Sequence, residues 1–450
     1  MKTIGRYTIL GLLGKGGMGK VFKIAYPVTG KIAALKLLEP NPFLLSLMGK
    51  TDIEAMFEKE AVTMARIRHP NVVDILDFDT WNGKPFYIMS FYCNNLGLMI
   101  GEGYETELPS RIIPFEKALS YAVDTLKGLA CLHDADIIHR DIKPFNLLVT
   151  DYDRVKICDF GLSRLRGEIR KDPNGLKVGS PYYTAPEQED DPDQADRRSD
   201  LYSVGVMLYR MLTGTLPSKT LEPPSRFNPD IEDEWDDCFL KAIRENPDER
   251  FPNAESFIAA LERVREKWVR KKENICAAPA FLFDDDDDAK PPLQKTPRSR
   301  PMKIGKSAAA DRFDLDPLMR PHQYQKGCFV PESPSVVRDD ATGLLWQVGG
   351  SGFPLKWQDA HDYIRRLNRE KFHGRSDWRL PTMAELLTIL SPPPQGEAHC
   401  IDPVFDQSRK WLWSADRCTF ISAWYLSLDL GFIATNDMSS YYYAKGVCIS

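Results

Sequence analysis

The chain has 450 residues, of which 43% are hydrophobic and 27% are charged, and its net charge is -5 at pH 7. At roughly 150 residues per domain, this length allows two or three domains with sizeable cores and excludes a wholly disordered chain. The small negative charge gives no general reason to expect nucleic-acid binding, and no apolar run is long enough for a membrane span or a signal peptide, so we expect a cytoplasmic protein.

Composition divides the chain into three stretches. Residues 1–270 have globular patterning, with strand-like runs first and helix-like runs later. Residues 271–320 hold five consecutive aspartates, Asp284–Asp288, then a basic, proline-rich tract with few large apolar residues. Such a composition predicts a flexible linker. Residues 321–450 are again globular and contain six of the nine tryptophans, so we predict a second folded domain there.

A glycine-rich turn is the first motif along the chain. The pattern GxGxxGxV is formed by Gly14, Gly16, Gly19 and Val21. Dinucleotide-binding folds use similar glycines, and Glu39 even lies where such folds place an acid. However, the residues after Gly19 are strand-like and not helical, so the pattern predicts a hairpin whose backbone closes over phosphates.

Lys36 interrupts the next apolar strand-like run, residues 32–38. A buried lysine is costly unless it is paired. Glu60 lies in a helix-like run with an apolar stripe, over residues 55–67. We expect Glu60 to be the partner of Lys36.

Residues 137–149 contain an acid, a lysine and an amide within six positions, namely Asp141, Lys143 and Asn146. A second acid, Asp159, follows 18 residues after Asp141. Oxygen ligands suit Mg²⁺ and a lysine suits a transferred phosphate, so these residues predict a site for a metal-bound phosphate.

These motifs together resemble those of protein kinases, specifically bacterial Ser/Thr kinases of the eukaryotic-like type, over about residues 5–268. The order and spacing of the full set carry the resemblance, which further includes His139-Arg140-Asp141, Asp159-Phe160-Gly161, Ala185-Pro186-Glu187, Asp200 and Arg250. The resemblance implies an α+β chain with a bilobal kinase fold, ATP and Mg²⁺ as cofactors, and protein substrates with Ser or Thr.

The resemblance also implies the roles around the nucleotide. The glycine loop would cover the ATP phosphates, and Lys36 would hold the α- and β-phosphates while paired with Glu60. The adenine would lie among Val21, Ala34 and Leu148. The backbone of residues 91–93 would face the adenine, with either Ser90 or Met89 as the gatekeeper.

Further roles follow for the reacting groups. Asp141 would accept or orient the proton of the substrate hydroxyl, and Lys143 would neutralise the γ-phosphate. Asn146 and Asp159 would ligate Mg²⁺. Asp200 would anchor the catalytic loop. Glu187 and Arg250 would form a buried ion pair.

Two features concern substrate and regulation. The lysine two positions after Asp141 resembles the Ser/Thr-kinase arrangement, as does the loop from Gly179 to Glu187, in which Ser180 takes the place usual for Thr. Residues 162–178 contain no Thr or Tyr, and their only hydroxyl is that of Ser163. We hypothesise that activation does not depend on phosphorylation there, and that Glu168 serves as a fixed acid. The alternative to an active enzyme is a catalytically weak kinase scaffold whose C-terminal domain binds a partner.

The sequence pattern of the C-terminal domain predicts two strands, two helices and then several short strands. It resembles the C-type-lectin-like domain that ends the Legionella collagen-like adhesin, most specifically through Trp378-Arg379-Leu380-Pro381-Thr382. The spacing of Thr382 and Glu385 predicts a capping box. The resemblance implies a small α+β domain for ligand sensing or substrate recruitment, with a protein or glycan ligand. The Tyr- and Ser-rich residues 436–443 are either a contact surface or a core strand.

Overall fold

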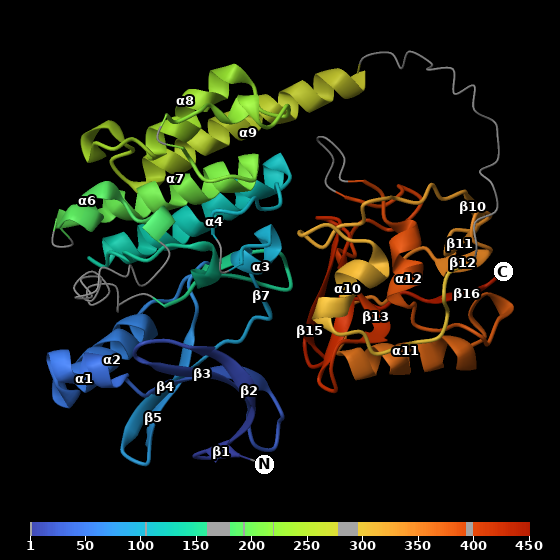
Figure 1. Cartoon of the computed structure of the whole chain (residues 1–450), viewed down its shortest axis with the longest axis horizontal. Coiled ribbons are helices and arrows are strands. Elements are labelled where there is room, and N and C mark those ends of the chain that lie inside the picture. The colour runs from blue at the N-terminus through green and yellow to red at the C-terminus, as the bar shows by residue number, and fades with distance from the viewer. Residues whose placement is uncertain are drawn as a thin grey trace. The chain divides into compact units, whose positions relative to one another are not determined.

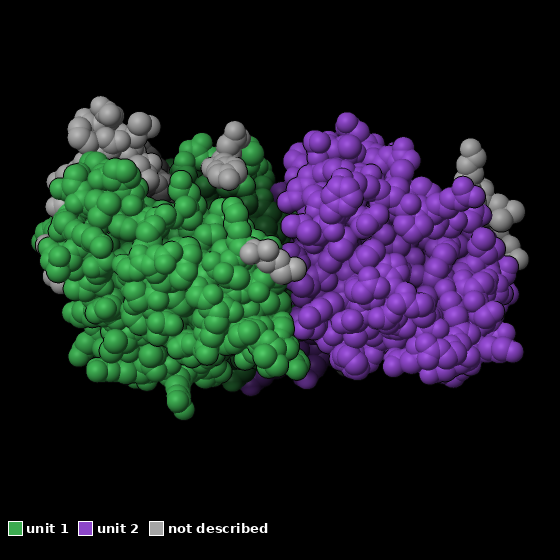
Figure 2. All heavy atoms as spheres, turned by 90° about the horizontal axis from the view of Figure 1, so that it is seen from below, with its two compact units in different colours: residues 1–112, 118–268 green, residues 113–117, 269–450 purple. Residues whose placement is uncertain are grey.

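The computed structural model describes residues 2–103, 106–159, 181–191, 194–218, 220–277, 296–392 and 399–450. The chain divides into two compact units, which Figure 2 colours separately: residues 1–112 with 118–268, and residues 113–117 with 269–450. The expectations for Phe160, Gly161, Ser163, Glu168, Ser180 and the aspartate run lie outside the described residues.

The first part of unit 1 is an antiparallel sheet with strand order β1-β2-β3-β4-β6-β5 (Figure 1). Its strands are β1 (Thr3–Ile4), β2 (Tyr7–Lys15), β3 (Gly19–Ala25), β4 (Ile32–Leu38), β5 (Ile75–Trp81) and β6 (Lys84–Met89). Two helices, α1 (Pro42–Met48) and α2 (Lys50–Arg66), lie between β4 and β5 in the chain. Six successive residues of β4 are buried, so Lys36 has little access to solvent and must find its partners inside the protein.

The second part of unit 1 is mostly helical. Its helices are α3 (Leu96–Ile100), α4 (Phe115–Asp134), α6 (Pro186–Asp190), α7 (Arg197–Thr213), α8 (Asp233–Ala242) and α9 (Ala254–Ala277). A small sheet is formed by β7 (Asn94–Asn95), β8 (Leu147–Val149) and β9 (Val155–Ile157). The candidate residue Asn146 directly precedes β8, and Asp159 follows β9. In α7, a Cβ on Gly205 would lie 2.6 Å from that of Ala242, so a glycine lets α7 and α8 pack closely. The predicted bilobal α+β fold is confirmed.

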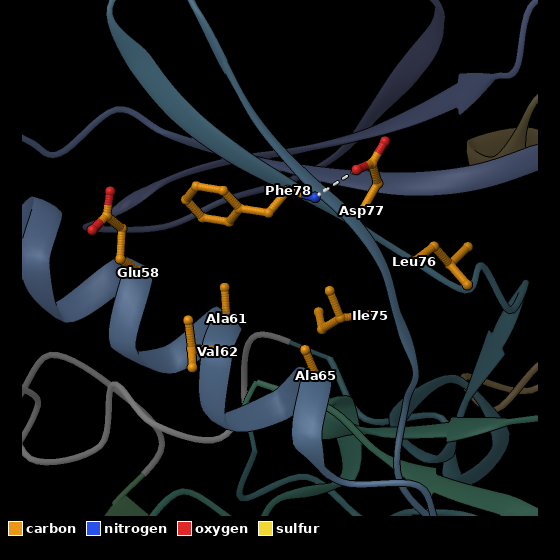
Figure 3. A pocket seen from close by; sticks show the side chains of 8 residues that line it. All are labelled: Glu58, Ala61, Val62, Ala65, Ile75, Leu76, Asp77 and Phe78. Carbon is orange, nitrogen blue, oxygen red and sulfur yellow. Dashed lines mark hydrogen bonds between the residues drawn. The ribbon is translucent and has the colours of Figure 1, made fainter.

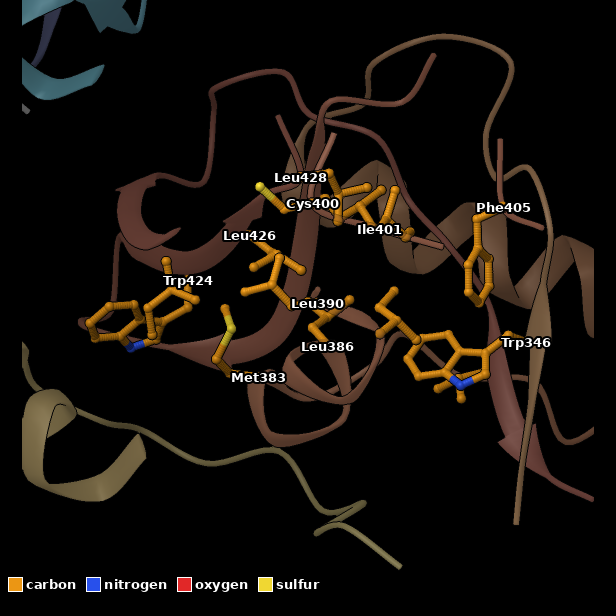
Figure 4. Packing of buried hydrophobic residues seen from close by; sticks show 14 of the residues in the cluster. Trp346, Met383, Leu386, Leu390, Cys400, Ile401, Phe405, Trp424, Leu426 and Leu428 are labelled. Carbon is orange, nitrogen blue, oxygen red and sulfur yellow. The ribbon is translucent and has the colours of Figure 1, made fainter. Parts of the chain in front are cut away.

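Unit 2 is built on two antiparallel sheets. One has the order β10 (Phe329–Ser333), β11 (Val336–Asp339), β12 (Leu344–Gln347) and β16 (Val447–Ile449), and the other β13 (Trp411–Arg417), β14 (Ser422–Ser427) and β15 (Phe432–Asp437). Helices α11 (Trp357–Arg369) and α12 (Met383–Leu386) are the two predicted ones, and the capping box of Thr382 and Glu385 is confirmed. Figure 4 shows the core, in which Trp346 and Trp424 flank Met383, Leu386 and Leu426.

The predicted linker, residues 271–320, needs correction at both ends. Helix α9 continues to Ala277, and residues 296–320 belong to unit 2, where they form α10 (Lys306–Phe313). Ile304, Ala309 and Leu315 are buried in its core. These few apolar side chains are separated by charged residues, so average composition hides them. The last strand, β16, begins only at Val447, so Tyr441 lies outside it.

Candidate active site

Lys36 joins two acids from different parts of unit 1. Its Nζ lies 2.8 Å from Oδ1 of Asp159 and 3.3 Å from Oε1 of Glu60 in α2. Tyr87 of β6 donates its hydroxyl to the same Glu60 oxygen at 3.0 Å. The predicted Lys36–Glu60 pair is therefore present, and the lysine also reaches Asp159.

Burial and charge act in opposite directions on this cluster. Burial is the largest influence on the pKa of Lys36 and would lower it, but Asp159, Tyr87 and Glu60 together outweigh burial and hold that pKa well above its ordinary value. Burial would raise the pKa of Asp159, yet Lys36 holds it below the usual range. Burial raises the pKa of Glu60 against the pull of Lys36. Lys36 thus stays cationic and Asp159 anionic, as phosphate and metal binding require.

The catalytic loop gathers Asp141, Lys143 and Asn146. Nζ of Lys143 lies 3.1 Å from the Asp141 carboxylate. Nδ2 of Asn146 donates to the backbone carbonyl of Asp141 at 2.7 Å and to its Oδ2 at 2.9 Å. These two donors orient the carboxylate, whose side chain keeps 12% of its surface exposed. The carboxylate is therefore held in place and still open to a substrate.

Asp200 fixes the backbone of this loop from α7. Its carboxylate accepts the backbone N–H groups of His139 at 2.8 Å and Arg140 at 2.7 Å. Arg140 has a φ of 62°, a left-handed conformation that a non-glycine residue adopts at a cost. The buried Asp200 compensates that cost, and its predicted anchoring contact is confirmed.

The residues proposed for the metal are tied to each other through the backbone. The carbonyl of Asn146 accepts the N–H of Cys158, directly before Asp159, at 3.0 Å. Because Asn146 uses its amide nitrogen on Asp141, its side-chain oxygen is the atom that suits a hard cation. Among the described residues, no cluster of three or more His, Cys, Asp or Glu side chains could hold a metal. One carboxylate and one amide fit Mg²⁺ carried by phosphates, because that ion keeps waters and needs few protein ligands.

The glycine loop forms the turn between β2 and β3. The N–H of Gly16 bonds the carbonyl of Gly19 at 2.9 Å. A Cβ on Gly19 would lie 2.1 Å from the carbonyl oxygen of Leu37, so this glycine is required by packing against β4. A Cβ on Gly14 or Gly16 would meet nothing within 4 Å, so the space beside these two stays open. Such space is what a phosphate chain needs.

The residues expected around the adenine come from three strands. In the sheet register Val21 stands opposite Lys36, and Ala34 stands opposite Met89. Leu148 lies in β8, and it and Val21 keep partial exposure. Strand β6 ends at Met89, and the gatekeeper choice between Ser90 and Met89 stays open.

Glu39 forms ion pairs with two lysines. Its carboxylate lies 2.5 Å from Nζ of Lys20 and 2.9 Å from Nζ of Lys84. The hydrogen bonds from Lys20 and Lys84 lower the pKa of Glu39 to about 2. Glu39 therefore links β3 to β6. Because a strand and not a helix follows the glycine loop, the predicted hairpin is confirmed and the dinucleotide-binding alternative is not.

The predicted ion pair of Glu187 and Arg250 is confirmed. Both terminal nitrogens of Arg250 bind the Glu187 carboxylate, at 2.7 and 2.8 Å. This bidentate geometry is a strong one for a charged pair. It fixes the end of the segment that follows Ser180.

Sequence reasoning missed a second buried cluster beside this segment. The hydroxyl of Tyr183 donates to Glu102 at 2.7 Å and accepts from Arg210 at 2.9 Å, and Arg210 lies 3.5 Å from Glu102. Glu102 follows α3 and Arg210 lies in α7, so no local spacing reveals the contact. The available signal was that Glu102 and Arg210 lie near apolar runs, where a charged side chain needs a partner.

In unit 2, residues 436–443 divide between core and surface. Tyr442 is fully buried, and Nδ2 of Asn436 donates to its hydroxyl at 2.7 Å. Tyr441 is 40% exposed, next to Lys356. Phe353, Phe420 and Ile421 are exposed as well. We call Phe353, Lys356, Phe420, Ile421 and Tyr441 the β15-end surface; Ile421 and Met438, which follows β15, are joined by a backbone hydrogen bond.

An apolar cavity of about 340 Å³ lies between α2 and β5 (Figure 3). Ala61, Val62, Ala65 and Phe78 line it, with Glu58 and Asp77 at its edge. It offers few polar groups, and none of the predicted site residues line it, so we do not assign the nucleotide to it.

None of the helices in the described residues is long and apolar enough to cross a membrane. Two family models match the chain: the protein kinase domain over residues 7–274 and the Lcl C-terminal domain over residues 335–448.

Curated relatives match mainly the first model's region. A probable serine/threonine-protein kinase of Clostridium perfringens is 30% identical over 62% of this chain and 41% of its own length. Serine/threonine-protein kinase pkn3 of Myxococcus xanthus is 32% identical over 58% and 51%. MasK of the same species, named as a tyrosine-protein kinase, is 29% identical over 58% and 43%. The chain therefore spans about half the length of these relatives or less. The solved PknI kinase domain of Mycobacterium tuberculosis covers 58% of this chain and 97% of its own, with 22% identity and a TM-score of 0.44.

Proposed function

The chain belongs to the protein kinase family, and on that basis we propose that it transfers the γ-phosphate of Mg-ATP to serine and threonine hydroxyls of proteins. The observation that carries the proposal is Lys36 bound to both Glu60 and Asp159, beside an oriented Asp141. This arrangement needs no movement of α2 before Lys36 can hold a phosphate.

Each side chain then has a chemical task. Asp141 receives or orients the proton of the acceptor hydroxyl, and Lys143, 3.1 Å away, offers positive charge to the transferring group. Lys36 holds the nucleotide phosphates. Asn146 and Asp159 would hold Mg²⁺, which when bound neutralises charge on the phosphate oxygens.

Serine and threonine are proposed as acceptors because of the lysine two positions after Asp141. The match to a relative named as a tyrosine kinase makes this point worth testing. The full chain would be incubated with γ-labelled ATP, Mg²⁺ and casein, and the labelled residues identified by phosphoamino-acid analysis. Phosphoserine or phosphothreonine supports the proposal, and phosphotyrosine alone contradicts it. Nucleotide binding without transfer favours the scaffold alternative.

For unit 2 we propose a lectin-like role, in which the β15-end surface binds a protein or glycan ligand for sensing or substrate recruitment. The support is that Phe353 is 65%, Phe420 80% and Tyr441 40% exposed, and that the half-buried Lys356 lies against the Tyr441 ring. Exposed aromatic side chains at one place on a domain commonly mark an interaction surface. A glycan array probed with the full chain and with the variant Phe353→Ala/Tyr441→Ala tests the glycan form. Binding that the double variant does not weaken contradicts this surface.

A further inference from the structure

The N-terminal segment of unit 2 is fastened by an ion pair of Arg298 and Asp416. The guanidinium nitrogens of Arg298 lie 3.1 Å from Oδ1 and 2.6 Å from Oδ2 of Asp416. The Asp416 side chain is fully buried, whereas that of Arg298 keeps 23% exposure. A buried carboxylate depends on such a partner, because an uncompensated buried charge is strongly destabilising.

The same carboxylate holds two further parts of unit 2. Oδ1 accepts the backbone N–H of Met302 and Oδ2 that of Met383, both at 2.8 Å. The hydroxyl of Thr382 donates to the carbonyl of Arg298 at 2.6 Å. We call this set the Asp416 clamp. It ties residues 298–302 to the start of α12 and the end of β13.

Thr296 lies just outside the clamp. It is exposed, lies in no helix or strand, and stands two positions before Arg298. Ser299 is half-buried between clamped residues, and Ser307 lies within α10. Of these three hydroxyls, that of Thr296 combines exposure with a backbone that is not part of a helix or of the clamp.

We propose that Thr296 is a phosphorylation site of the chain's own kinase unit, and that its phosphorylation loosens the Asp416 clamp. This inference rests on the proposed function. The Thr296 hydroxyl oxygen forms a bond to the γ-phosphorus of ATP, the bond to the β-phosphate oxygen breaks, ADP leaves, and the hydroxyl proton passes to Asp141 and then to solvent.

The consequence follows from charge. A phosphothreonine carries about -2 charges and three acceptor oxygens. Two residues from Arg298, it competes with Asp416 for the same guanidinium, which favours bidentate phosphate contacts. The exposed phosphate keeps its hydration, whereas Asp416 loses its countercharge, so unit 2 becomes less stable.

The first test is phosphosite mapping by mass spectrometry after the full chain is incubated with Mg-ATP, with casein present in a parallel sample. We expect phosphate on Thr296, no phosphate at that position in Thr296→Ala, and unchanged Thr296 labelling in the matched control Ser299→Ala. Labelled casein with an unmodified Thr296 overturns this inference and leaves the proposed function standing. If neither is labelled, the proposed function fails and this inference with it.

The second test measures the clamp through the melting temperature of unit 2 in the full chain. We expect phosphorylation to lower this temperature, Arg298→Gln to lower it without ATP, and phosphorylation of Arg298→Gln to lower it no further. If Arg298→Gln does not fold, Arg298→Lys, which keeps the charge but loses the bidentate contact, replaces it. A phosphorylated Thr296 with an unchanged melting temperature overturns the loosening of the clamp.

Discussion

Nζ of Lys36 lies 2.8 Å from Oδ1 of Asp159, although the two residues are 123 positions apart in the chain. The contact joins the sheet of unit 1 to the segment that follows β9. Glu60 approaches the same lysine from α2 at 3.3 Å. Lys36 is therefore already held by both Asp159 and Glu60 before a nucleotide binds to it.

Glu60→Gln tests the worth of the second contact. It removes the negative charge of the group that accepts from Lys36, and a hydrogen bond to a charged group contributes roughly 1.5–3 kcal/mol. We expect kcat/KM for ATP to fall roughly 10- to 100-fold, because each 1.4 kcal/mol is about tenfold. Tyr87→Phe is the matched control, since it removes only the hydroxyl that bonds Glu60. An unchanged kcat/KM in Glu60→Gln would contradict the role of Glu60 in holding Lys36 for the nucleotide.

Glu39 provides a prediction about pH. Its pKa is lowered to about 2 from an ordinary value near 4.5, by Lys20 first and then Lys84. A lowered acid pKa stabilises the folded state above pH 4.5, and the contribution is lost as the pH falls from about 4.5 to about 2. Urea midpoints of unit 1 should differ between wild type and Glu39→Gln at pH 7 and 5, and the difference should become much smaller by pH 2. A difference at pH 2 as large as that at pH 7 contradicts this assignment.

Tyr183 is predicted to position the end of the Gly179–Glu187 loop, which we expect to contact the protein substrate. Tyr183→Phe removes both bonds of its hydroxyl, to Glu102 and to Arg210. We expect KM for a protein substrate to rise several-fold while KM for ATP stays unchanged, because the two hydrogen bonds of the Tyr183 hydroxyl go to Glu102 and Arg210 and to none of the residues expected to hold the nucleotide. Steady-state kinetics with each substrate varied in turn separates the two constants. A rise in KM for ATP alone would contradict a positioning role.

Arg210→Met tests the same cluster through stability. It leaves the Glu102 carboxylate buried without its charge partner, a change that costs about 3–5 kcal/mol. Burial already raises the pKa of Glu102. Urea denaturation should show a lowered midpoint for unit 1 and an unchanged one for unit 2. Equal shifts in both transitions would contradict a local effect.

Residues 296–320 are predicted to be needed for unit 2 to fold stably. They bury Ile304, Ala309 and Leu315, and the indole N–H of Trp424 donates to the Ile304 carbonyl at 2.9 Å. Burying one large aliphatic side chain contributes about 1.5–3 kcal/mol. A fragment of residues 296–450 should therefore melt more than about 10 °C above a fragment of residues 321–450. Equal melting temperatures would support the expectation from composition that the linker extends to residue 320.

The residues of the candidate site could be proposed from the sequence because phosphate chemistry requires particular side chains at fixed short spacings. Asp141, Lys143 and Asn146 lie within six positions, so the motif is visible without the fold. The Lys36–Glu60 pair followed from the cost of a buried lysine. These are local or energetic signals, and the structure contains the predicted contact of Lys36 with Glu60.

The missed features depend on contacts between distant residues. Tyr183 and Glu102 are 81 positions apart, and nothing near either one indicates the other. Ile304 and Leu315 are too few and too widely spaced to change the average composition of a 50-residue stretch. Their burial becomes evident only in the folded core of unit 2, where Ile304 forms hydrogen bonds with Arg417 of β13 and Trp424 of β14.

The most direct test of the account is transfer of label from γ-labelled ATP to casein by the full chain with Mg²⁺, compared with that by Asp141→Asn. Asparagine keeps the size of the side chain but cannot take the hydroxyl proton. We predict turnover by the wild type and a loss of roughly 10²- to 10⁴-fold in the variant, the usual worth of a positioned base. Equal turnover by the two proteins, or none by the wild type, would contradict the assignment of Asp141 as the catalytic residue of an active kinase.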